Sequence, residues 1–469
     1  MPRPLLLRGG HLLDPASGRD EAGDLLLLDG RVAAVGGSLA APADAEIIDL
    51  AGQIVTPGWI DLHTHLREPG FEYKETIRGG AAAAAQGGFT TICCMPNTSP
   101  PLDSPEQIAY IYRQARGAAV RVLPIGTITQ GRALEEPVDF AALAAAGAIG
   151  FSDDGESTRS TAAMVAALEA SKALNRPVMV HCEDPDLVRG GAMNAGPVAE
   201  RLGIPGSPDI AEEVVLARDL TLAAATGGWL FACHTTTARG VALIREAKAR
   251  GVRVTAEVTP HHLALTDEWV AGSRRLWWEA DPGVRGEPAD PNTKVNPPLR
   301  TGADIEALVA GLLDGTIDTI GTDHAPHAPR DKPEVGRRKS EGAEAEPSSR
   351  SGFRLPTSAF AQAASGMLAF EVALPTLLSL VRAGALDLPT IIRKLTVAPA
   401  AVLGDLLPNG AGTLAVGAPA DVTVFDPARR WTVTPESLRS TSKNTPLLGL
   451  EVQGQVTLTV VDGDVRYRA

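Results

Sequence analysis

Two histidines separated by one residue, His63 and His65, follow an apolar run at residues 54–60. Side chains of an extended strand repeat with a period of two, so both imidazoles point to the same side and can share one cation. Arg67 has the same parity, and its guanidinium can reach a carboxylate held near that cation. The alternative is a hydrophobic strand that happens to end in two surface histidines. The positions of the other histidines decide between these interpretations.

Further residues of metal-binding type fall at the ends of apolar, β-branched runs. The runs occupy residues 89–95, 120–125, 148–151, 177–182, 228–233, 252–257 and 318–322. The polar residues at or just after their ends are Asn97, Asp153, Asp154, His181, His234, His261, His262, Asp323, His324 and His327. Together with His63 and His65, these positions include every one of the nine histidines except His11. Surface histidines scattered at random would not cluster in this way.

Imidazole nitrogens together with one bridging carboxylate suit a pair of Zn²⁺ ions. The candidate ligands are His63, His65, Asp153, His181, His234 and Asp323. Two cations ~3.5–4 Å apart can hold a hydroxide between them, because they lower the pKa of bound water toward neutrality. Asp323 is the catalytic candidate that takes the proton and passes it to a leaving nitrogen. A role as a plain ligand is the alternative for Asp323, and one side chain can serve both roles.

Helix-length stretches, several of them rich in alanine, separate the apolar runs. They occupy residues 73–86, 104–116, 160–174, 210–225, 238–250 and 303–313. With the strand before His63, the runs make eight β-then-α units, the pattern of an α/β protein with a (β/α)₈ TIM-type barrel. The active site of such a barrel lies at the carboxyl ends of its strands, where the candidate ligands fall.

Both chain ends differ from this middle. They contain short apolar bursts and hairpin signals such as Asp29-Gly30. We therefore expect residues 1–55 and 405–469 to form one small β-sandwich domain and residues 56–404 to form the hydrolase barrel. Residues 334–362 are polar and irregular, which favours a solvated, disordered insertion over a lid that contacts substrate.

The composition limits the partners and the compartment. A net charge of −13 and a pI near 5.3 argue against nucleic acid or an anionic membrane as partner. The four cysteines lie in apolar runs and resemble buried thiols of a reducing compartment, so we expect a cytoplasmic protein. The apolar run at residues 5–7 is too short for a signal peptide or a membrane span.

Seven motifs together resemble the class I dihydroorotases of the amidohydrolase superfamily, and they cover nearly the whole chain. They are HTHLREPG at 63–70, EYKET at 72–76, CMPNT at 94–98, HCED at 181–184, TAEVTPHH at 255–262, NPPLR at 296–300 and TDHAPH at 322–327. The resemblance implies the reversible cyclisation of N-carbamoyl-L-aspartate to L-dihydroorotate in pyrimidine synthesis, with two zinc ions per subunit. It also implies a homodimer, and some relatives bind aspartate transcarbamoylase; the residues themselves indicate neither.

By this resemblance, one zinc would be bound by His63, His65 and Asp323, and the other by His181 and His234, with Asp153 between them. The residues implied to hold the substrate are His65, Arg67, Asn97, Asn296 and His327. Arg67 would pair with the substrate carboxylate. The alternative for Asn97 and Asn296 is a turn position.

Many relatives bridge their metals with a carboxylated lysine at the end of the fourth strand. This chain has no lysine between Lys74 and Lys172, so Asp153 or Asp154 must replace it. We favour Asp153, because it comes first after the strand, and expect Asp154 to cap the following turn.

Two further features concern residues around the ligands. The family usually has a Phe-Gly pair that touches the pyrimidine ring, whereas this chain has Ser365-Gly366, so the aromatic contact is missing. The family does not use His261 and His262 as ligands, and we expect them to pack against or support the ligands.

Other functions predict other residues. Hydantoinases, dihydropyrimidinases and allantoinases share the barrel but generally carry the lysine bridge, which this chain lacks. A non-catalytic subunit of aspartate transcarbamoylase would have lost ligands, whereas every ligand position is filled here.

Overall fold

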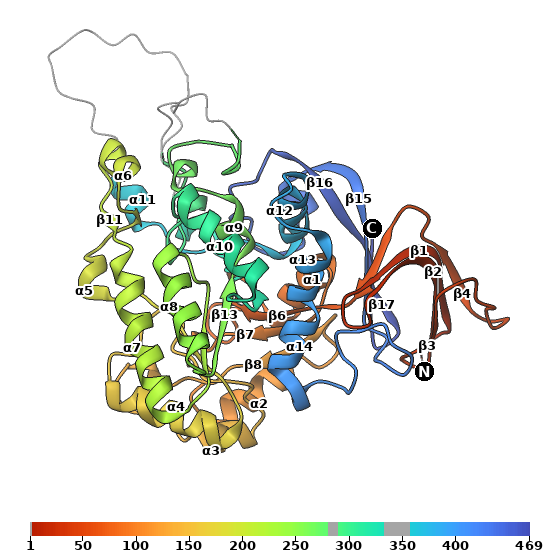
Figure 1. Ribbon diagram of the computed structural model, residues 1–469, viewed down its shortest axis with the longest axis horizontal. Coiled ribbons are helices and arrows are strands. Elements are labelled where there is room, and N and C mark those ends of the chain that lie inside the picture. Colours follow the sequence, from red (N-terminus) through yellow and green to blue (C-terminus); the bar gives the residue numbers. More distant parts are fainter. Residues whose placement is uncertain (1, 280–288, 333–356) are drawn as a thin grey trace, which may run out of the picture.

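Strands from both chain ends form one eight-stranded sheet in the computed structural model, which describes residues 2–279, 289–332 and 357–469 (Figure 1). At its centre β5 pairs in parallel with β1 and antiparallel with β15, so the two ends of the chain join there. Leu12, Val55 and Val424 belong to one buried cluster beneath it. The strands are β1 (Leu5–Asp14), β2 (Arg19–Leu28), β3 (Arg31–Val35), β4 (Glu46–Asp49), β5 (Ile54–Pro57), β15 (Val422–Thr432), β16 (Glu451–Val461) and β17 (Asp464–Arg468).

The middle of the chain contains two parallel sheets. One has β6 (Trp59–Thr64), β7 (Phe89–Cys94) and β8 (Arg121–Pro124); the other has β9 (Val178–Val180), β12 (Leu230–Ala232), β13 (Val254–Val258) and β14 (Thr319–Ile320). Single parallel bridges join them along both edges, because Phe151 pairs with Gly126 and Val178, and Thr64 pairs with His324. The run predicted at 148–151 contributes only these bridges and no strand of its own.

Helices follow most of the parallel strands. They are α1 (Ile77–Gln86), α2 (Pro105–Gln114), α3 (Phe140–Ala145), α4 (Thr161–Leu174), α5 (Pro185–Val188), α6 (Pro197–Leu202), α7 (Ile210–Thr226), α8 (Ala238–Ala249), α9 (Pro260–Ala264), α10 (Gly302–Asp314), α11 (Thr357–Gln362), α12 (Phe370–Arg382), α13 (Leu388–Leu395) and α14 (Val397–Leu403). Side-chain caps explain several starts: Thr76, Ser160 and Thr237 each accept a backbone N–H of the first helical turn. The buried faces of α1, α4, α7 and α8 pack on the parallel strands in one large core cluster.

Two short strands and one predicted segment complete the description. Strands β10 (Met193–Asn194) and β11 (Gly206–Ser207) pair only with each other. Of the polar insertion predicted at 334–362, residues 334–356 lie outside the described residues. Its last six residues, 357–362, form α11.

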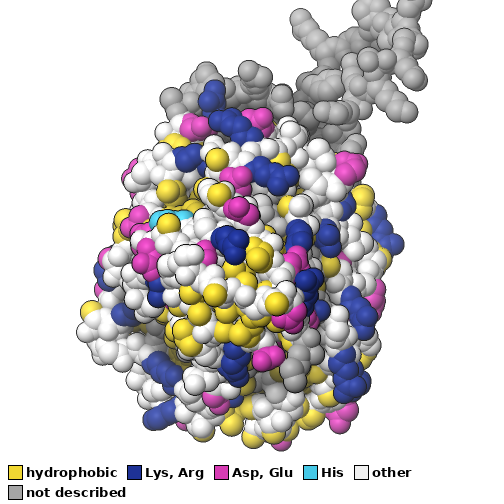
Figure 2. Space-filling view, turned by 90° about the vertical axis from the view of Figure 1, so that its right-hand side faces the viewer, with side chains coloured by type: hydrophobic (Ala, Val, Ile, Leu, Met, Phe, Trp, Pro, Cys, Tyr) yellow, Lys and Arg dark blue, Asp and Glu magenta, His cyan; other side chains and the backbone are white. Residues whose placement is uncertain are grey.

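The surface carries charges of both signs. Figure 2 shows acidic and basic side chains interspersed on the face that carries the sheet of both chain ends. Within the described part of the chain, no helix is both long enough and apolar enough to cross a bilayer.

Candidate metal centre and substrate pocket

Two buried histidines come from the end of β6, as the period-two pattern predicts. The Nδ1 atom of His63 lies 3.0 Å from Oε1 of Glu257, and Nδ1 of His65 lies 2.9 Å from Oδ1 of Asn97. Because a carboxylate and an amide oxygen only accept hydrogen bonds, each Nδ1 carries the proton. The Nε2 atoms therefore face the interior, toward Asp154 and Asp323, where a cation would need them.

Two more histidines face the same point from the ends of β9 and β12. Nε2 of His181 lies 3.1 Å from Oε2 of Glu183, so this outer nitrogen donates to a carboxylate and Nδ1 faces the cluster. That Nδ1 lies 3.0 Å from Nε2 of His234. The backbone of His234 has a φ of 28°, a left-handed conformation that costs energy for a residue with a side chain. Such strain is common at functional sites, where surrounding contacts enforce it.

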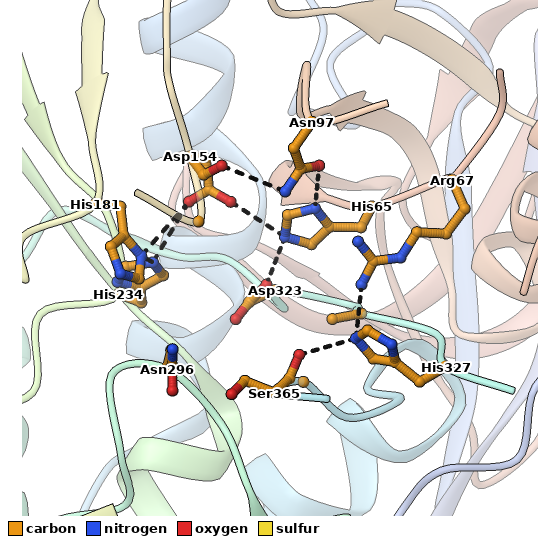
Figure 3. Close-up of a pocket in the computed structure, with 13 residues that line it drawn as sticks. His65, Arg67, Asn97, Asp154, His181, His234, Asn296, Asp323, His327 and Ser365 are labelled. Carbon is orange, nitrogen blue, oxygen red and sulfur yellow. Dashed lines mark hydrogen bonds and ion pairs between the residues drawn. The ribbon is translucent and has the colours of Figure 1, made fainter. Parts of the chain in front are cut away.

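Asp154, and not Asp153, is the carboxylate among these histidines (Figure 3). Its Oδ1 lies 3.4 Å from Nε2 of His63 and 3.6 Å from Nε2 of His234, and its Oδ2 lies 3.4 Å from Nε2 of His65. Burial alone would raise the pKa of Asp154, but His63 and the neighbouring imidazoles lower it well below its ordinary value. Asp154 is therefore ionised at neutral pH.

The choice of Asp153 from the sequence is corrected by its contacts. Its Oδ1 accepts the backbone N–H groups of Ile128 and Thr129, each at 3.1 Å, and its Oδ2 accepts the hydroxyls of Thr129 and Thr158. None of these partners is one of the four histidines. Asp153 thus anchors the chain around residues 128–129, and its neighbour is the one that reaches the histidines.

Asp323 completes the cluster from the segment after β14. Its Oδ1 lies 3.0 Å from Nε2 of His65 and 3.6 Å from Nε2 of His63. Burial alone would raise the pKa of Asp323, but the hydrogen bond from His65 and the charge of His63 lower it strongly. Asp323 has a φ of 47°, so it too is held in the strained left-handed region.

These residues fit a metal centre by their geometry. His63, His65 and Asp154 form one group, and Asp154, His181 and His234 form another, with the potential ligand atoms of each group within 4.8 Å of one another. Among the described residues, Nε2 of His63 and Oδ1 of Asp154 are buried without a hydrogen-bond partner. Buried polar atoms without partners are costly, and a cation between them would satisfy both.

The substrate residues expected from the sequence line one cavity of about 160 Å³. Of the expected residues, it is lined by His65, Arg67, Asn97, His181, His234, Asn296, Asp323 and His327, together with Asp154. In Figure 3, His181 and His234 lie on one side of Asp323, and Arg67 and His327 lie on the other. The cavity therefore has a histidine-rich side and a positively charged side.

Arg67 is fixed by its surroundings before any substrate arrives. It is 9% exposed, its Nε donates to the carbonyl of Pro326 at 3.1 Å, and its backbone φ is 63°. Burial lowers the pKa of Arg67 to about 10, so the guanidinium stays charged at neutral pH. A fixed, charged fork of this kind suits a carboxylate ligand.

His327 is a neutral imidazole next to this charge. Burial, Arg67 and Lys74 all lower the pKa of His327, so its imidazole is uncharged. Its Nδ1 lies 3.3 Å from Nζ of Lys74, which can only donate, and its Nε2 lies 2.8 Å from the carbonyl of Ser365. Nε2 of His327 also lies 3.1 Å from Nη2 of Arg67, so this nitrogen stands between a donor and an acceptor.

Ser365 and Gly366, which stand where the family has Phe-Gly, also line the cavity. Gly366 has a φ of 130°, and an added Cβ would lie 2.6 Å from Cβ of Ala325 and 3.2 Å from Nε2 of His327. Only glycine fits there. The pair thus offers backbone and no aromatic ring to a ligand.

His261 and His262 lie outside both metal-ligand groups. Nδ1 of His262 lies 2.8 Å from Oγ1 of Thr259, and its Nε2 lies 3.0 Å from the carbonyl of Pro297. Burial lowers the pKa of His261 to about 4, so it is neutral. His262 supports the chain next to Asn296.

Three residues around the site were missed by the sequence analysis as orienting groups: Glu257, Glu183 and Lys74. A signal existed for Glu257, because it is a charged residue in an apolar run that forms a buried strand. No comparable signal singles out Lys74, whose partner His327 is distant in the sequence.

Comparison with known proteins agrees with this geometry. A family model described as "Dihydro-orotase-like" matches residues 52–239. A protein named dihydroorotase from Syntrophus aciditrophicus (strain SB) is 43% identical over 466 residues, which cover 99% of each chain. Another protein of that name, from Anaeromyxobacter sp. (strain K), is 44% identical over 462 residues, which cover 98% of this chain and 97% of that one.

Solved structures of other amidohydrolases share the fold. L-hydantoinase (dihydropyrimidinase) from Arthrobacter aurescens is 25% identical with a TM-score of 0.79, and the match covers 98% of this chain and 95% of that one. D-hydantoinase from Bacillus sp. AR9 is 26% identical with a TM-score of 0.77, covering 99% and 95%. These structures are more distant in sequence than the two dihydroorotases.

Proposed function

This chain belongs to the dihydroorotase family, and we propose that it catalyses the reversible cyclisation of N-carbamoyl-L-aspartate to L-dihydroorotate, the third step of pyrimidine synthesis. One observation carries the proposal: a single cavity contains both the buried His and Asp cluster and the fixed guanidinium of Arg67. A cyclic amide that bears a carboxylate matches both sides of such a cavity.

We propose that the eight parallel segments form a closed (β/α)₈ barrel within residues 56–404. The bridges of Phe151 with both its neighbours, and of Thr64 with His324, support closure. The likeness to hydantoinase structures supports the same architecture. The sheet of both chain ends would then be the small β-sandwich domain, formed by residues 1–55 and 405–469.

We propose that two zinc ions bind in the cluster, because imidazole and carboxylate ligands suit Zn²⁺. His63, His65 and Asp323 would hold one ion, His181 and His234 the other, and Asp154 would bridge them. When bound, such cations supply Lewis acidity, which lowers the pKa of water and polarises an amide carbonyl. The outer partners Glu257, Asn97 and Glu183 support this assignment, since they fix the tautomers of three of the histidines.

In the direction of ring opening, water adds to the ring carbonyl carbon and the bond to the ring nitrogen breaks. Asp323 takes a proton from the water and returns it to the leaving nitrogen, so no net proton is gained or lost at the carboxylate. Cyclisation follows the same path in reverse. The low pKa of Asp323 favours its ionised, proton-accepting form at neutral pH.

The substrate would be oriented by the other side of the cavity. Arg67 would pair with its carboxylate, and His327, which contacts Arg67, would line the same side of the substrate. Asn97 and Asn296 would hydrogen-bond the ring amides, which need both donors and acceptors. A substrate held by fixed groups presents its carbonyl to the cluster at little entropic cost.

We also propose that the enzyme is cytoplasmic, because its four cysteines are all free and buried. The homodimer and the association with aspartate transcarbamoylase stay predictions from the resemblance.

The proposed reaction is tested with the purified full-length chain. We expect it to open dihydroorotate much faster than hydantoin, dihydrouracil or allantoin, and to contain zinc by elemental analysis. A strong chelator should remove the metal and the activity, and added Zn²⁺ should restore both. Turnover of hydantoin with none of dihydroorotate would overturn the substrate assignment, and full activity of the metal-free protein would overturn the metal centre.

A further inference from the structure

A segment from the far end of the chain reaches the substrate pocket. Residues 440–445 lie between β15 and β16 and contact the loop that follows β6. Thr441 donates its backbone N–H and its hydroxyl to the carboxylate of Glu75, at 2.7 and 2.8 Å. The hydroxyl of Ser442 donates to the carbonyl of Lys74 at 2.7 Å. The segment is therefore anchored beside the residue that orients His327.

One residue of this segment, Asn444, connects two other loops. Its Nδ2 donates to the carbonyls of Ala325 and Gly366, at 3.0 and 3.1 Å. Its Oδ1 accepts the backbone N–H of His327 at 2.9 Å, and its own carbonyl accepts that of Leu368 at 2.9 Å. The residue is 4% exposed, so water cannot replace these partners.

The two loops held by Asn444 form the wall of the cavity opposite the histidine cluster. Ala325 and His327 lie on one loop and Ser365 and Gly366 on the other, and all four line the cavity. The loops touch directly through the N–H of Ala325, which donates to the carbonyl of Met367 at 2.9 Å. Asn444 adds bonds on both sides of this contact and so fixes the distance between the loops.

We propose that Asn444 is a positioning residue for substrate binding: its side-chain amide holds the backbones of residues 325–327 and 366–368 so that His327 meets both Arg67 and Ser365. This inference rests on the proposed function, because it assumes that the wall of the cavity binds the substrate. Among the described residues, the side chain of Asn444 hydrogen-bonds to Ala325, His327 and Gly366, none of which is a proposed metal ligand. Its effect on the substrate is therefore separable from metal binding.

The chemistry of this position requires an amide. Two carbonyls need two donors and one N–H needs an acceptor, and asparagine supplies all three from one short side chain. Aspartate has the same shape and keeps the acceptor, but it places an oxygen against the two carbonyls. Alanine leaves all three buried backbone groups without partners.

The test uses Asn444→Asp and Asn444→Ala in the full-length protein. We expect KM for dihydroorotate to rise about tenfold or more while kcat changes less than about threefold, because lost hydrogen bonds loosen the wall and not the reacting groups. Zinc content should stay at the wild-type value. Asn444→Asp is the more informative variant, since it changes no volume.

A matched control is Asp14→Asn. Asp14 is equally buried and also ties distant segments together, since it accepts the N–H groups of Ala16 and Leu414 and the hydroxyl of Thr413, but it lies in the sheet of both chain ends. This variant should lower thermal stability without changing KM. An equal rise of KM in both variants, or loss of zinc in Asn444→Asp, would mean a general folding role and would overturn the inference.

Hydrogen exchange separates this inference from the proposed reaction. In the Asn444→Asp protein without substrate, amides at 325–328 and 366–369 should exchange faster than in wild type, while those of β6, β7 and β13 should not change. Unchanged exchange in the two loops would overturn the role of Asn444 whatever the wild-type protein catalyses. A wild-type protein that does not turn over dihydroorotate would instead overturn the proposed function alone.

Discussion

A single buried carboxylate faces four imidazoles in this protein. Asp154 keeps its negative charge because His63 and its neighbours lower its pKa against the effect of burial. Three of the histidines in turn point one ring nitrogen each into the cluster, because Glu257, Asn97 and Glu183 bind their outer N–H groups. The ligand set is thus organised in two layers: Asp154 with the inner ring nitrogens, and the outer partners that orient the rings.

The first prediction separates two adjacent residues. Asp154→Ala should lose bound metal and at least about 100-fold in activity, because it removes the carboxylate that both ligand groups share. Asp153→Ala should keep its metal but lower the free energy of unfolding by about 2–3 kcal/mol, because backbone N–H groups of Ile128 and Thr129 lose their acceptor. Elemental analysis and urea denaturation measure the two effects. Equal metal loss in both variants would contradict the assignment of the bridge to Asp154.

The second prediction concerns Lys332. Burial and nearby Lys294 lower the pKa of Lys332 to about 7. The unfolded chain binds this proton up to pH near 10, so between pH 7 and 10 the unfolded state holds more protons and the stability of the folded state rises with pH. Below pH 7 the cost of the buried charge is fully present. Lys332→Met should therefore reduce the slope of unfolding free energy against pH by up to about 1.4 kcal/mol per unit.

Urea denaturation at pH 7, 8 and 9 tests this slope, with the exposed Lys172→Met as control. The control should follow wild type at every pH. A Lys332→Met protein with the wild-type slope would show that the buried amine keeps an ordinary pKa.

At the scale of strands and loops, the period-two pattern of a strand predicts which side chains face the site. The prediction ends where the strand ends. His63 and His65 share one side because β6 is extended, and period two follows from that geometry. After Phe151 the chain turns, and which carboxylate faces inward depends on the N–H groups of Ile128 and Thr129. No local pattern contains those partners, so the choice between Asp153 and Asp154 could not be made from the sequence.

The strands and helices themselves were largely predictable, because their signals are local. The apolar runs end in polar residues where β7, β9, β12 and β13 end, and capping residues such as Thr76 mark helix starts. The run at 148–151 is the exception, since it makes only single bridges. Contacts between distant loops, such as those of Asn444, leave no periodic signal.

The third prediction uses the close approach of two strands. A Cβ at Gly321, just after β14, would lie 2.1 Å from Oε2 of Glu257 on β13. Glu257 is fully buried and bound to His63, so it cannot move aside without releasing that histidine. Gly321→Ala should therefore weaken metal binding about 10- to 100-fold, measured by competition with a chelator.

Gly302→Ala is the matched control, since nothing lies within 4 Å of a Cβ at that position on α10. It should leave metal affinity unchanged and should not destabilise the protein. Wild-type metal affinity in Gly321→Ala would show that Glu257 does not orient His63.

At the scale of the whole molecule, the sheet of both chain ends is bound to the parallel strands that carry the site. The N–H of Gly58, just before β6, donates to the carbonyl of Asp421 at 2.8 Å. Arg121, the first residue of β8, forks between the carboxylates of Asp421 and Asp462, and Oδ1 of Asp421 also accepts the N–H of Asp462 at 2.9 Å. The connection between the two parts is therefore polar and specific as well as apolar.

The last prediction tests this connection. Arg121→Met should lower the free energy of unfolding by about 2–3 kcal/mol, because removing one partner leaves the mostly buried Asp421 without its counter-charge. Arg430→Met removes an exposed pair with Glu451 in the same sheet and should cost less than about 1 kcal/mol. Urea denaturation compares the two, and KM for dihydroorotate should not change in either, because both arginines lie outside the residues that line the cavity. Equal stability losses would mean that the two parts are held together by apolar packing alone, since the fork at Arg121 would then contribute no more than a surface pair.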